Sequence, residues 1–370
     1  MKINWRTIKG TQNSYAALHA ACLQENIRLR AVDHPEDDVT CYSLNSINAP
    51  HFIDEIRSAS CITIAGGPHA SARIAEIAAV ADYVVVGEGE YTLPALIREI
   101  RNESGVIPPG VATREQVREA ASCVLLDAYP PFSEVKGYIE ITRGCPHACG
   151  YCQTPCLFGR RMRHRSVDRI VRAATAFRDV RFVTPNAFAY GSDGIHPRFD
   201  KLERLLSHLD NRIFLGTFPS EVRPEWVTDE SLDLIDTYCA NRRVHFGAQS
   251  GSNSVLRQLR RGHTVEDVIT AVELCRDHDI IPVVDIIVGL PCETDEDQEA
   301  TVRLARWITR YGSVHAHYFI PLPGTPLEGT AARPLLPETR RTLGRLALAG
   351  RATGAWMTPE VRFFRQNQNE

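Results

Sequence analysis

The sequence predicts an α/β protein made of two successive parallel-sheet domains. Three observations support this fold class. Short apolar runs alternate with stretches of helical spacing over residues 1–105, and the same alternation resumes at residue 137 and continues to about residue 323. A proline-containing segment, residues 106–135, separates the two patterns. Strand–helix alternation with short turns is typical of parallel sheets covered by helices, and 370 residues have room for two such domains.

The first pattern contains four candidate strands and three candidate helices. The strands are 27–32, 39–44, 61–65 and 83–86, and the helices are 14–25, 50–58 and 69–80. Parallel sheets bind ligands at the carboxyl ends of their strands. Here that edge would present Ser43, Ser46, Gly66-Gly67-Pro68-His69 and Gly87-Glu88-Gly89-Glu90. Taken alone, Gly66-Gly67 indicates a turn, because the sequence has neither the Gly-x-Gly-x-x-Gly fingerprint nor a P-loop.

The second pattern has six strand–helix units, too few for a closed eight-stranded barrel. The expected strands are 137–142, 180–184, 212–217, 244–247, 282–288 and 314–320, and the expected helices are 166–177, 197–208, 229–240, 264–277 and 294–311. Ser166, Asp229 and Thr294 each precede an acidic residue at or near the third following position, which is a helix-start signal. Residues 326–370 should hold one amphipathic helix, 337–348, and a polar tail.

A cysteine-rich loop follows the first strand of the second pattern. Cys145, Cys149 and Cys152 have the spacing Cys-x3-Cys-x2-Cys, in a stretch whose two glycines and proline exclude a regular helix. Thiolates are the main ligands of iron–sulfur clusters, and three of them leave one iron of a four-iron cluster open. A structural zinc site would need a fourth ligand, for which Cys156 is near in sequence. Disulfides are not expected, because the chain shows no secretory signal.

This cysteine spacing, with the aromatic Tyr151 just before Cys152, resembles the signature of the radical S-adenosylmethionine (radical SAM) superfamily. Residues 66–69 and 82–90 resemble the N-terminal domain of the cobalamin-binding branch of that superfamily, and residues 249–252 and 285–291 also look like methylthiotransferases. The resemblance implies a Rossmann-like, cobalamin-binding-like domain (1–105), a linker (106–135), a partial (β/α)6 radical SAM barrel (136–325), and a C-terminal helix and tail (326–370).

The resemblance also implies a reaction. Cys145, Cys149 and Cys152 would hold a 4Fe–4S cluster that cleaves S-adenosylmethionine reductively and generates a 5′-deoxyadenosyl radical, and the expected outcome is cobalamin-dependent methylation of an unactivated carbon. Many cobalamin domains carry Asp-x-His-x-x-Gly, which this chain lacks. Cobalamin would therefore bind without a protein histidine ligand, or the domain would keep the fold without the cofactor. The alternatives are a methylthiotransferase acting on tRNA or protein, with a second cluster, and a non-enzymatic iron–sulfur or zinc protein.

Candidate site residues lie mostly at the expected carboxyl ends of the barrel strands, where parallel barrels carry their functional groups. The cofactor-binding candidates are Tyr151, Asn186, Ser220, Glu221, Arg223, Gln249, Gly289 and Glu293, with Gly66 and Gly67 in the first domain. Asn186 departs from the Gly-Gly-Glu common in the family, and Ser220 and Glu221 could simply begin a loop. Tyr190 and Cys292 are candidate catalytic residues. Cys292 stands where relatives commonly have glycine, and it could donate a hydrogen atom, accept a methyl group, or only fill space as a buried thiol.

Composition and charge restrict the partners. The chain is 44% hydrophobic and 24% charged, with a formal net charge of −3, so no overall positive field attracts it to nucleic acid. The sequence has no run of about 18 apolar residues and no signal-peptide pattern, so we expect a cytoplasmic protein that does not span membranes. The expected partners are a small-molecule or peptide substrate and an electron donor such as flavodoxin or ferredoxin.

Overall fold

The computed structural model describes residues 1–120 and 123–357, which form two compact units. The first unit comprises residues 1–140 together with 156–159 and 168–173. The second comprises 141–155, 160–167 and the chain from Ala174 onward. Both units are α/β with parallel strands, so the predicted fold class is confirmed.

The first unit is built on a six-stranded sheet of order β2-β1-β3-β4-β5-β6. Its strands are β1 (Ile3–Arg6), β2 (Leu29–Val32), β3 (Val39–Ser43), β4 (Ile62–Gly66), β5 (Tyr83–Val85) and β6 (Val111–Ala112). The first five are parallel, and β6 is antiparallel to β5. The order 2-1-3-4-5 is that of flavodoxin-like sheets, in which ligands bind where the order reverses, here between β1 and β3.

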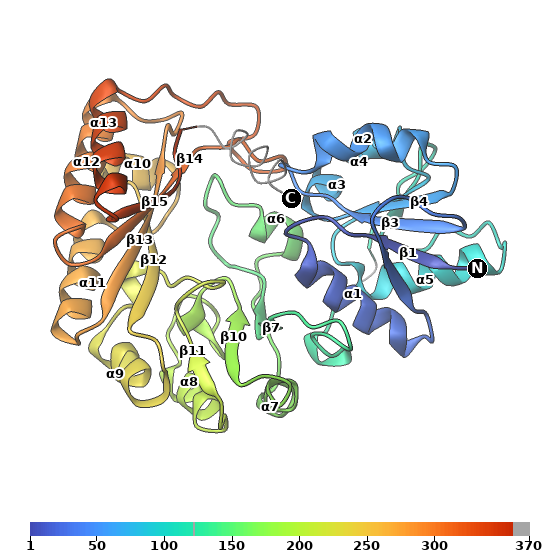
Figure 1. Cartoon of the computed structure of the whole chain (residues 1–370), viewed down its shortest axis with the longest axis horizontal. Helices are drawn as coiled ribbons and strands as arrows, with labels where there is room; N and C mark the ends of the chain where they lie inside the picture. The colour runs from blue at the N-terminus through green and yellow to red at the C-terminus, as the bar shows by residue number, and fades with distance from the viewer. Residues whose placement is uncertain (121–122, 358–370) are drawn as a thin grey trace. The chain divides into compact units, whose positions relative to one another are not determined.

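Helices cover both faces of this sheet (Figure 1). The helices are α1 (Gln12–Gln24), α2 (Ala49–Ser58), α3 (Pro68–Ala72), α4 (Ile74–Ala78) and α5 (Gly89–Arg101), with a 3-10 turn at Leu126–Ala128. One buried cluster joins Trp5 and Leu29 to Leu96 of α5, and a second joins Tyr42 to Ile56 of α2 and Ile77 of α4. The sheet therefore lies between two hydrophobic layers, as its nearly continuous apolar strands require.

Four features of this unit differ from the sequence expectation. Strand β1 was not among the expected strands. Helix α5 was not among the expected helices, and it contains Pro94, which lacks the N–H that a helix interior uses. Residues 69–80, expected as one helix, are divided into α3 and α4 at Arg73, whose backbone is not helical. Residues 106–135, expected as a connector, contribute β6 to the sheet.

The strands from residue 139 onward are β7 (Ile139–Glu140), β8 (Thr142–Arg143), β9 (Arg163–His164), β10 (Asp179–Val183), β11 (Arg212–Phe214), β12 (Arg243–Gln249), β13 (Ile281–Val288), β14 (Ser313–Tyr318) and β15 (Ala352–Ala355). Strand β7 belongs to the first unit, and the others belong to the second, in which β8 and β9 form a short antiparallel pair. Strands β10 and β11 pair in parallel, and β12-β13-β14-β15 form one parallel sheet. Between them, the His245 N–H donates to the Gly216 carbonyl (2.7 Å) and the Val222 N–H donates to the His245 carbonyl (2.8 Å).

Strand β15 is an addition to the expected set, because residues 326–370 were expected to hold only α13 and a tail. The strand extends the sheet beyond β14 in parallel register. Residues 358–370 of the expected tail lie outside the described chain.

The helices of this part of the chain are α6 (Thr154–Phe158), α7 (Val167–Ala174), α8 (Phe199–Leu206), α9 (Asp229–Tyr238), α10 (Asn253–Gln258), α11 (Val265–Asp277), α12 (Asp295–Ile308) and α13 (Pro337–Leu348). Figure 1 shows α11, α12 and α13 along one side of the sheet formed by β12–β15. Three of these helices begin with a capping box, in which a threonine and the residue three positions later satisfy each other's backbone N–H. The threonines are Thr228, Thr264 and Thr294. Across residues 1–120 and 123–357, no helix combines the length and the apolar character needed to cross a membrane.

Candidate active site

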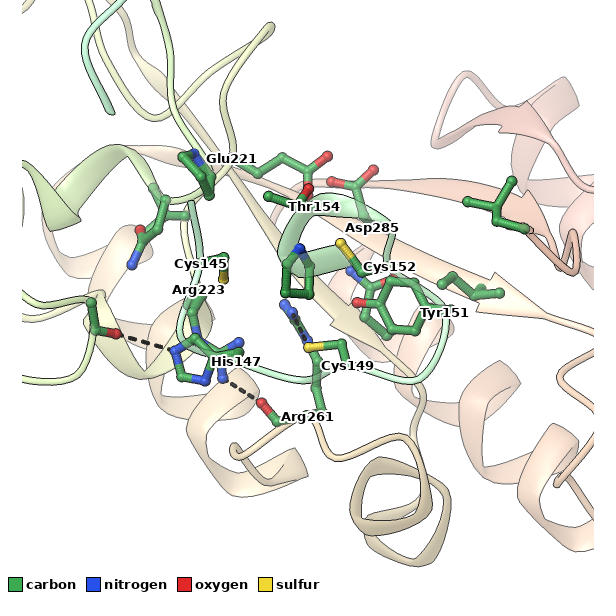
Figure 2. Close-up of a pocket in the computed structure, with 18 of the residues that line it drawn as sticks. Cys145, His147, Cys149, Tyr151, Cys152, Thr154, Glu221, Arg223, Arg261 and Asp285 are labelled. Atoms are coloured by element: carbon green, nitrogen blue, oxygen red, sulfur yellow. Dashed lines mark hydrogen bonds between the residues drawn. The ribbon is translucent and has the colours of Figure 1, made fainter. Parts of the chain in front are cut away.

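A cavity of about 370 Å³ lies at the parallel strands of the second unit, bordered by the cysteine-rich loop (Figure 2). Eight sequence-predicted site residues line it: Cys145, Cys149, Tyr151, Cys152, Asn186, Glu221, Arg223 and Gln249. They come from the loop after β8 and from the segments that follow or end β10, β11 and β12. The structure thus gathers on one cavity the three cysteines and polar side chains from three further strand ends.

Backbone hydrogen bonds fix the cysteine-rich loop at several points. The Gly150 N–H donates to the Leu259 carbonyl (2.9 Å), and the Gly150 carbonyl accepts from Leu327 N–H (3.1 Å). Within the loop, the Cys152 N–H donates to the Cys149 carbonyl (3.1 Å). A Cβ at Gly150 would lie only 3.4 Å from the Leu327 side chain, so glycine suits this close packing. The three sulfur atoms are therefore carried by an ordered segment of the chain.

A buried arginine contacts the cysteine-rich loop at Cys149. The Arg261 Nη1 atom lies 3.7 Å from Cys149 Sγ, and Nη2 donates to the Gly247 carbonyl (3.0 Å). Arg261 is only 8% exposed, and its backbone carbonyl accepts a hydrogen bond from Arg223. Burial raises the pKa of both Cys145 and Cys152, so these free thiols hold their protons at neutral pH. Metal binding at the loop would consequently release protons, because thiolate is the ligand form.

Gln249 reaches the cavity through an irregularity of the sheet. Strand β12 shifts register against β13 between Gly247 and Gln249, and Gln249 has φ +67°, a left-handed conformation that side-chain-bearing residues seldom adopt. Side chains held in such conformations cluster at functional sites. Gly247 accommodates the bulge, because a Cβ there would lie 2.1 Å from Gln249 Nε2.

Two carboxyl groups face the cavity from neighbouring elements. Figure 2 shows Glu221, after β11, close to Asp285 on β13. The Glu221 side chain is accessible to solvent, and the walls of the cavity surround it. This partial desolvation, together with the negative charge of Asp285, raises the pKa of Glu221.

Other predicted site residues do not line the cavity. Ser220 is buried, where its hydroxyl donates to the Phe182 carbonyl and accepts from Thr184 N–H (3.1 Å). The Tyr190 hydroxyl donates to the Arg165 carbonyl (2.7 Å), and the Tyr190 ring packs edge-on against His164. Both contacts stabilise the fold, so the structure does not support the catalytic role suggested for Tyr190. Gly66 and Gly67 belong to the first unit.

The turn after β13 also faces away from the cavity. Gly289 has φ +78°, and its carbonyl accepts from Arg333 N–H (2.8 Å). Cys292 packs beside the buried side chains of Val255, Leu290 and Phe319, which favours the packing interpretation of this thiol over a catalytic one. Glu293 is 2% exposed, and its Oε2 accepts from Gly289 N–H (3.1 Å).

Glu293 provides the first testable prediction. Burial raises its pKa from the ordinary 4.5 to about 8, so between these pH values the folded chain keeps a proton that the unfolded chain has released. Stability from this group is present below pH 4.5 and is lost as the pH rises through 8. We expect Glu293→Gln to match the parent in thermal unfolding at pH 5 and to exceed its stability at pH 9 by about 1 kcal/mol or more. Identical pH profiles for the two proteins would show that the carboxyl group is not desolvated.

Four of the other cavity-lining residues have a charged or imidazole side chain and were not assigned a role from the sequence: His147, Arg261, Asp285 and His317. Arg261 follows the short helix α10 rather than a strand, so the strand-end rule did not point to it. His317 and His315 lie two positions apart on β14 and hence on one face, and this spacing was a usable signal.

The geometry agrees with a comparison against protein families. The family model described as the radical SAM superfamily matches residues 139–305, the segment that carries the cysteine loop and strands β10–β13. Residues 139–305 belong to the radical SAM superfamily. The resemblance inferred from the cysteine spacing is therefore confirmed.

Curated relatives of this chain are named tRNA-2-methylthio-N(6)-dimethylallyladenosine synthases. The Rickettsia rickettsii protein is 31% identical over 299 residues, which are 75% of this chain and 63% of the relative. The Pelobacter propionicus protein is 32% identical over 213 residues, which are 54% of this chain and 47% of the relative. The chain thus spans about half to two thirds of the length of the relatives it matches.

Two solved structures share the fold of this chain. The radical S-adenosylmethionine methyltransferase TsrM from Kitasatospora setae, with cobalamin and a 4Fe–4S cluster bound, has a TM-score of 0.67 at 17% identity, covering 88% of this chain and 74% of TsrM. The cobalamin-dependent S-adenosylmethionine radical enzyme OxsB, with aqua-cobalamin bound, has a TM-score of 0.64 at 16% identity, covering 100% of this chain and 61% of OxsB. At these identities the likeness concerns the fold alone.

Proposed function

We propose that this chain is a radical SAM enzyme in which Cys145, Cys149 and Cys152 hold a 4Fe–4S cluster and the adjoining cavity binds S-adenosylmethionine. The observation that carries the proposal is the convergence of three sulfur atoms from one ordered loop on a cavity lined by polar strand ends. Among the cysteines of the described chain, these three alone line that cavity, and Cys156 is exposed. When bound, the reduced cluster supplies the electron that cleaves S-adenosylmethionine to methionine and a 5′-deoxyadenosyl radical.

The roles proposed for the cavity residues follow from their unused hydrogen-bonding groups. Asn186 Oδ1 accepts from Phe188 N–H, but its buried Nδ2 has no hydrogen-bond partner among the described residues. The buried Nε of Arg261 also has no hydrogen-bond partner among the described residues. These donors suit the carboxylate of S-adenosylmethionine, and Glu221 and Gln249 suit its ammonium and ribose hydroxyl groups. The protein's contribution is to orient the cofactor and to exclude water.

We further propose that the first unit binds cobalamin and that the reaction is methylation of an unactivated carbon. Support comes from the flavodoxin-like strand order and from buried polar atoms near the carboxyl edge of the sheet. Ser46 Oγ, after β3, and Nδ1 of His69, after β4, form no hydrogen bond with the described residues, whereas Nε2 of His69 lies 3.8 Å from Glu76 Oε1. Buried polar atoms normally have hydrogen-bond partners, so these atoms favour a polar ligand bound at this edge of the sheet. Cobalamin is named as bound in TsrM and OxsB, which share the fold.

A methylthiotransferase is the second candidate, because the sequence relatives carry that activity in their names. That reaction would need a second cluster in the first unit. The loops after β1, β2, β3, β4 and β5 contain no cysteine. Cys22 and Cys41 lie instead in the hydrophobic core, where burial raises the pKa of Cys22 to about 12. Of the other cysteines of this unit, Cys61 lies 3.4 Å from the Thr40 hydroxyl and Cys123 is exposed. The lack of cysteine in the strand-end loops is the observation that supports the methyltransferase as the first candidate.

The test is the metal content and turnover of anaerobically purified, cluster-reconstituted protein. We expect four irons per chain, binding of added cobalamin, and reductant-dependent formation of 5′-deoxyadenosine or of S-adenosylhomocysteine. About eight irons per chain would favour the methylthiotransferase. Failure to bind iron would refute the radical SAM proposal, and a four-iron protein that ignores cobalamin would refute only the methylation part. A small-molecule or peptide substrate, a flavodoxin or ferredoxin donor and a cytoplasmic location remain predictions from the sequence.

A further inference from the structure

A second group of potential metal ligands lies on strands β13 and β14, at the wall of the same cavity. It consists of Asp285 on β13 and His315 and His317 on β14. The two strands are parallel, and their register places Asp285 beside His315 and Ile287 beside His317. Side chains two positions apart on a strand share a face, so both imidazoles project on the side of Asp285.

The three side chains already approach one another closely. Asp285 Oδ1 lies 3.0 Å from His315 Nδ1 and 3.6 Å from His317 Nε2. The two imidazole centroids are 4.3 Å apart, and one ligand atom from each of the three residues falls within 4.8 Å of the other two. Bond lengths of about 2.0–2.2 Å at a tetrahedral zinc ion correspond to ligand–ligand separations of about 3.3–3.6 Å. The three side chains can therefore coordinate one ion after only small adjustments.

Asp285 supplies an independent sign of a missing partner. It is 3% exposed, its Oδ1 lies at ion-pair distance from both imidazoles, and its buried Oδ2 has no hydrogen-bond partner among the described residues. A buried carboxylate oxygen without a partner is costly, because it has lost its hydration without replacement. A bound cation would satisfy Oδ2 as well as Oδ1.

We propose that Asp285, His315 and His317 form a binding site for one divalent transition-metal ion such as Zn²⁺. Two imidazoles and one carboxylate are the ligand set of open catalytic zinc sites and of non-haem iron sites, which leave coordination positions for an exogenous oxygen or nitrogen ligand. Asp285 and His317 line the cavity, so the open positions face the space available to a substrate. An anionic or carbonyl oxygen of the substrate is the chemical group that such an ion would hold.

This site goes beyond the proposed radical chemistry and depends neither on the cluster nor on cobalamin. The ion would bind substrate at the wall formed by β13 and β14, and Glu221 lines the same cavity. The proposal can therefore hold or fail independently of the iron–sulfur centre.

The experiment measures Zn²⁺ binding by isothermal titration calorimetry on two forms of the full chain. One form is the cluster-reconstituted protein, and the other is the Cys145→Ser, Cys149→Ser, Cys152→Ser triple variant, which lacks the competing thiols. We expect about one zinc per chain in both forms, and an affinity about tenfold lower or weaker still after His317→Ala or Asp285→Asn. The His317 side chain is 46% exposed, so its truncation should leave the fold intact, which far-ultraviolet circular dichroism will verify.

A matched control comes from another histidine beside acidic residues. His278 lies 3.2 Å from both Asp229 and Asp236, outside the cavity lining, and His278→Ala should leave zinc affinity unchanged. Co²⁺ provides a second readout, since its spectrum in the triple variant should show ligand-field bands that disappear with His317→Ala. Two results would overturn the site: no stoichiometric zinc in either form, or zinc that survives both His317→Ala and Asp285→Asn with unchanged affinity.

Discussion

Replacing Cys145, Cys149 or Cys152 by alanine, one at a time, should reduce the iron bound per chain to near zero and abolish cleavage of S-adenosylmethionine. Each change removes one of only three thiolate ligands, and a four-iron cluster with two protein ligands is not retained through purification. The cluster absorbance and the iron content of anaerobically reconstituted protein provide the measurement. Cys149→Ser, at the cysteine that Arg261 contacts, should cause the same loss, because a hydroxyl group is a poor ligand where a soft thiolate is needed.

Cys156→Ala is the matched control for the cluster variants. Its thiol is exposed and absent from the cavity lining, although it lies only four residues beyond Cys152. This variant should retain the iron and the absorbance of the parent. Loss of iron on this change alone would indicate a fourth protein ligand and would contradict an open iron site.

Gly67→Ala should destabilise the first unit by about 3 kcal/mol or more. Gly67 has φ +97°, a conformation that costs an L-residue about 1–2 kcal/mol, and a Cβ there would lie 2.6 Å from the Leu44 carbonyl oxygen. That neighbour is backbone at the end of a core strand, so it cannot move aside as a flexible side chain would. Urea unfolding followed by circular dichroism will measure the change.

Gly10→Ala separates the two contributions to that loss. Gly10 also has a positive φ, +82°, but a Cβ there would meet nothing within 4 Å. We expect only the conformational cost, about 1 kcal/mol. If both substitutions cost the same, the close approach to Leu44 contributes nothing. If Gly67→Ala costs more, as we expect, Gly67 is better explained as a backbone requirement of the fold than as the cofactor contact suggested by the sequence.

The sequence was informative where local chemistry and spacing act together. The cysteine spacing pointed to the loop that borders the cavity, and the periodic apolar runs identified most parallel strands, because buried strands need consecutive apolar residues. Glu221, Arg223 and Gln249 could be placed near the cavity because parallel strands present their carboxyl ends at one edge.

That rule does not specify which way a turn faces. After β13 the backbone at Gly289 enters the left-handed region and bonds to Arg333, which carries Cys292 and Glu293 away from the cavity. Arg261 illustrates the opposite case: its guanidinium reaches Cys149 from a residue 112 positions later in the chain, and no local pattern encodes that contact. Tertiary packing determined both outcomes.

The capping boxes of α9, α11 and α12 have a practical consequence for changing what the enzyme accepts. Each helix start is set by a threonine and its own third neighbour, a local signal worth about 1 kcal/mol. The cavity residues Arg223 and Arg261 lie just upstream of two of these threonines, Thr228 and Thr264, but belong to neither capping box. Residues that line the cavity can therefore be substituted while each helix keeps its own N-terminal capping box. Libraries randomised at Glu221, with the threonines and Gln249 held constant, should yield a high proportion of folded variants with altered selectivity.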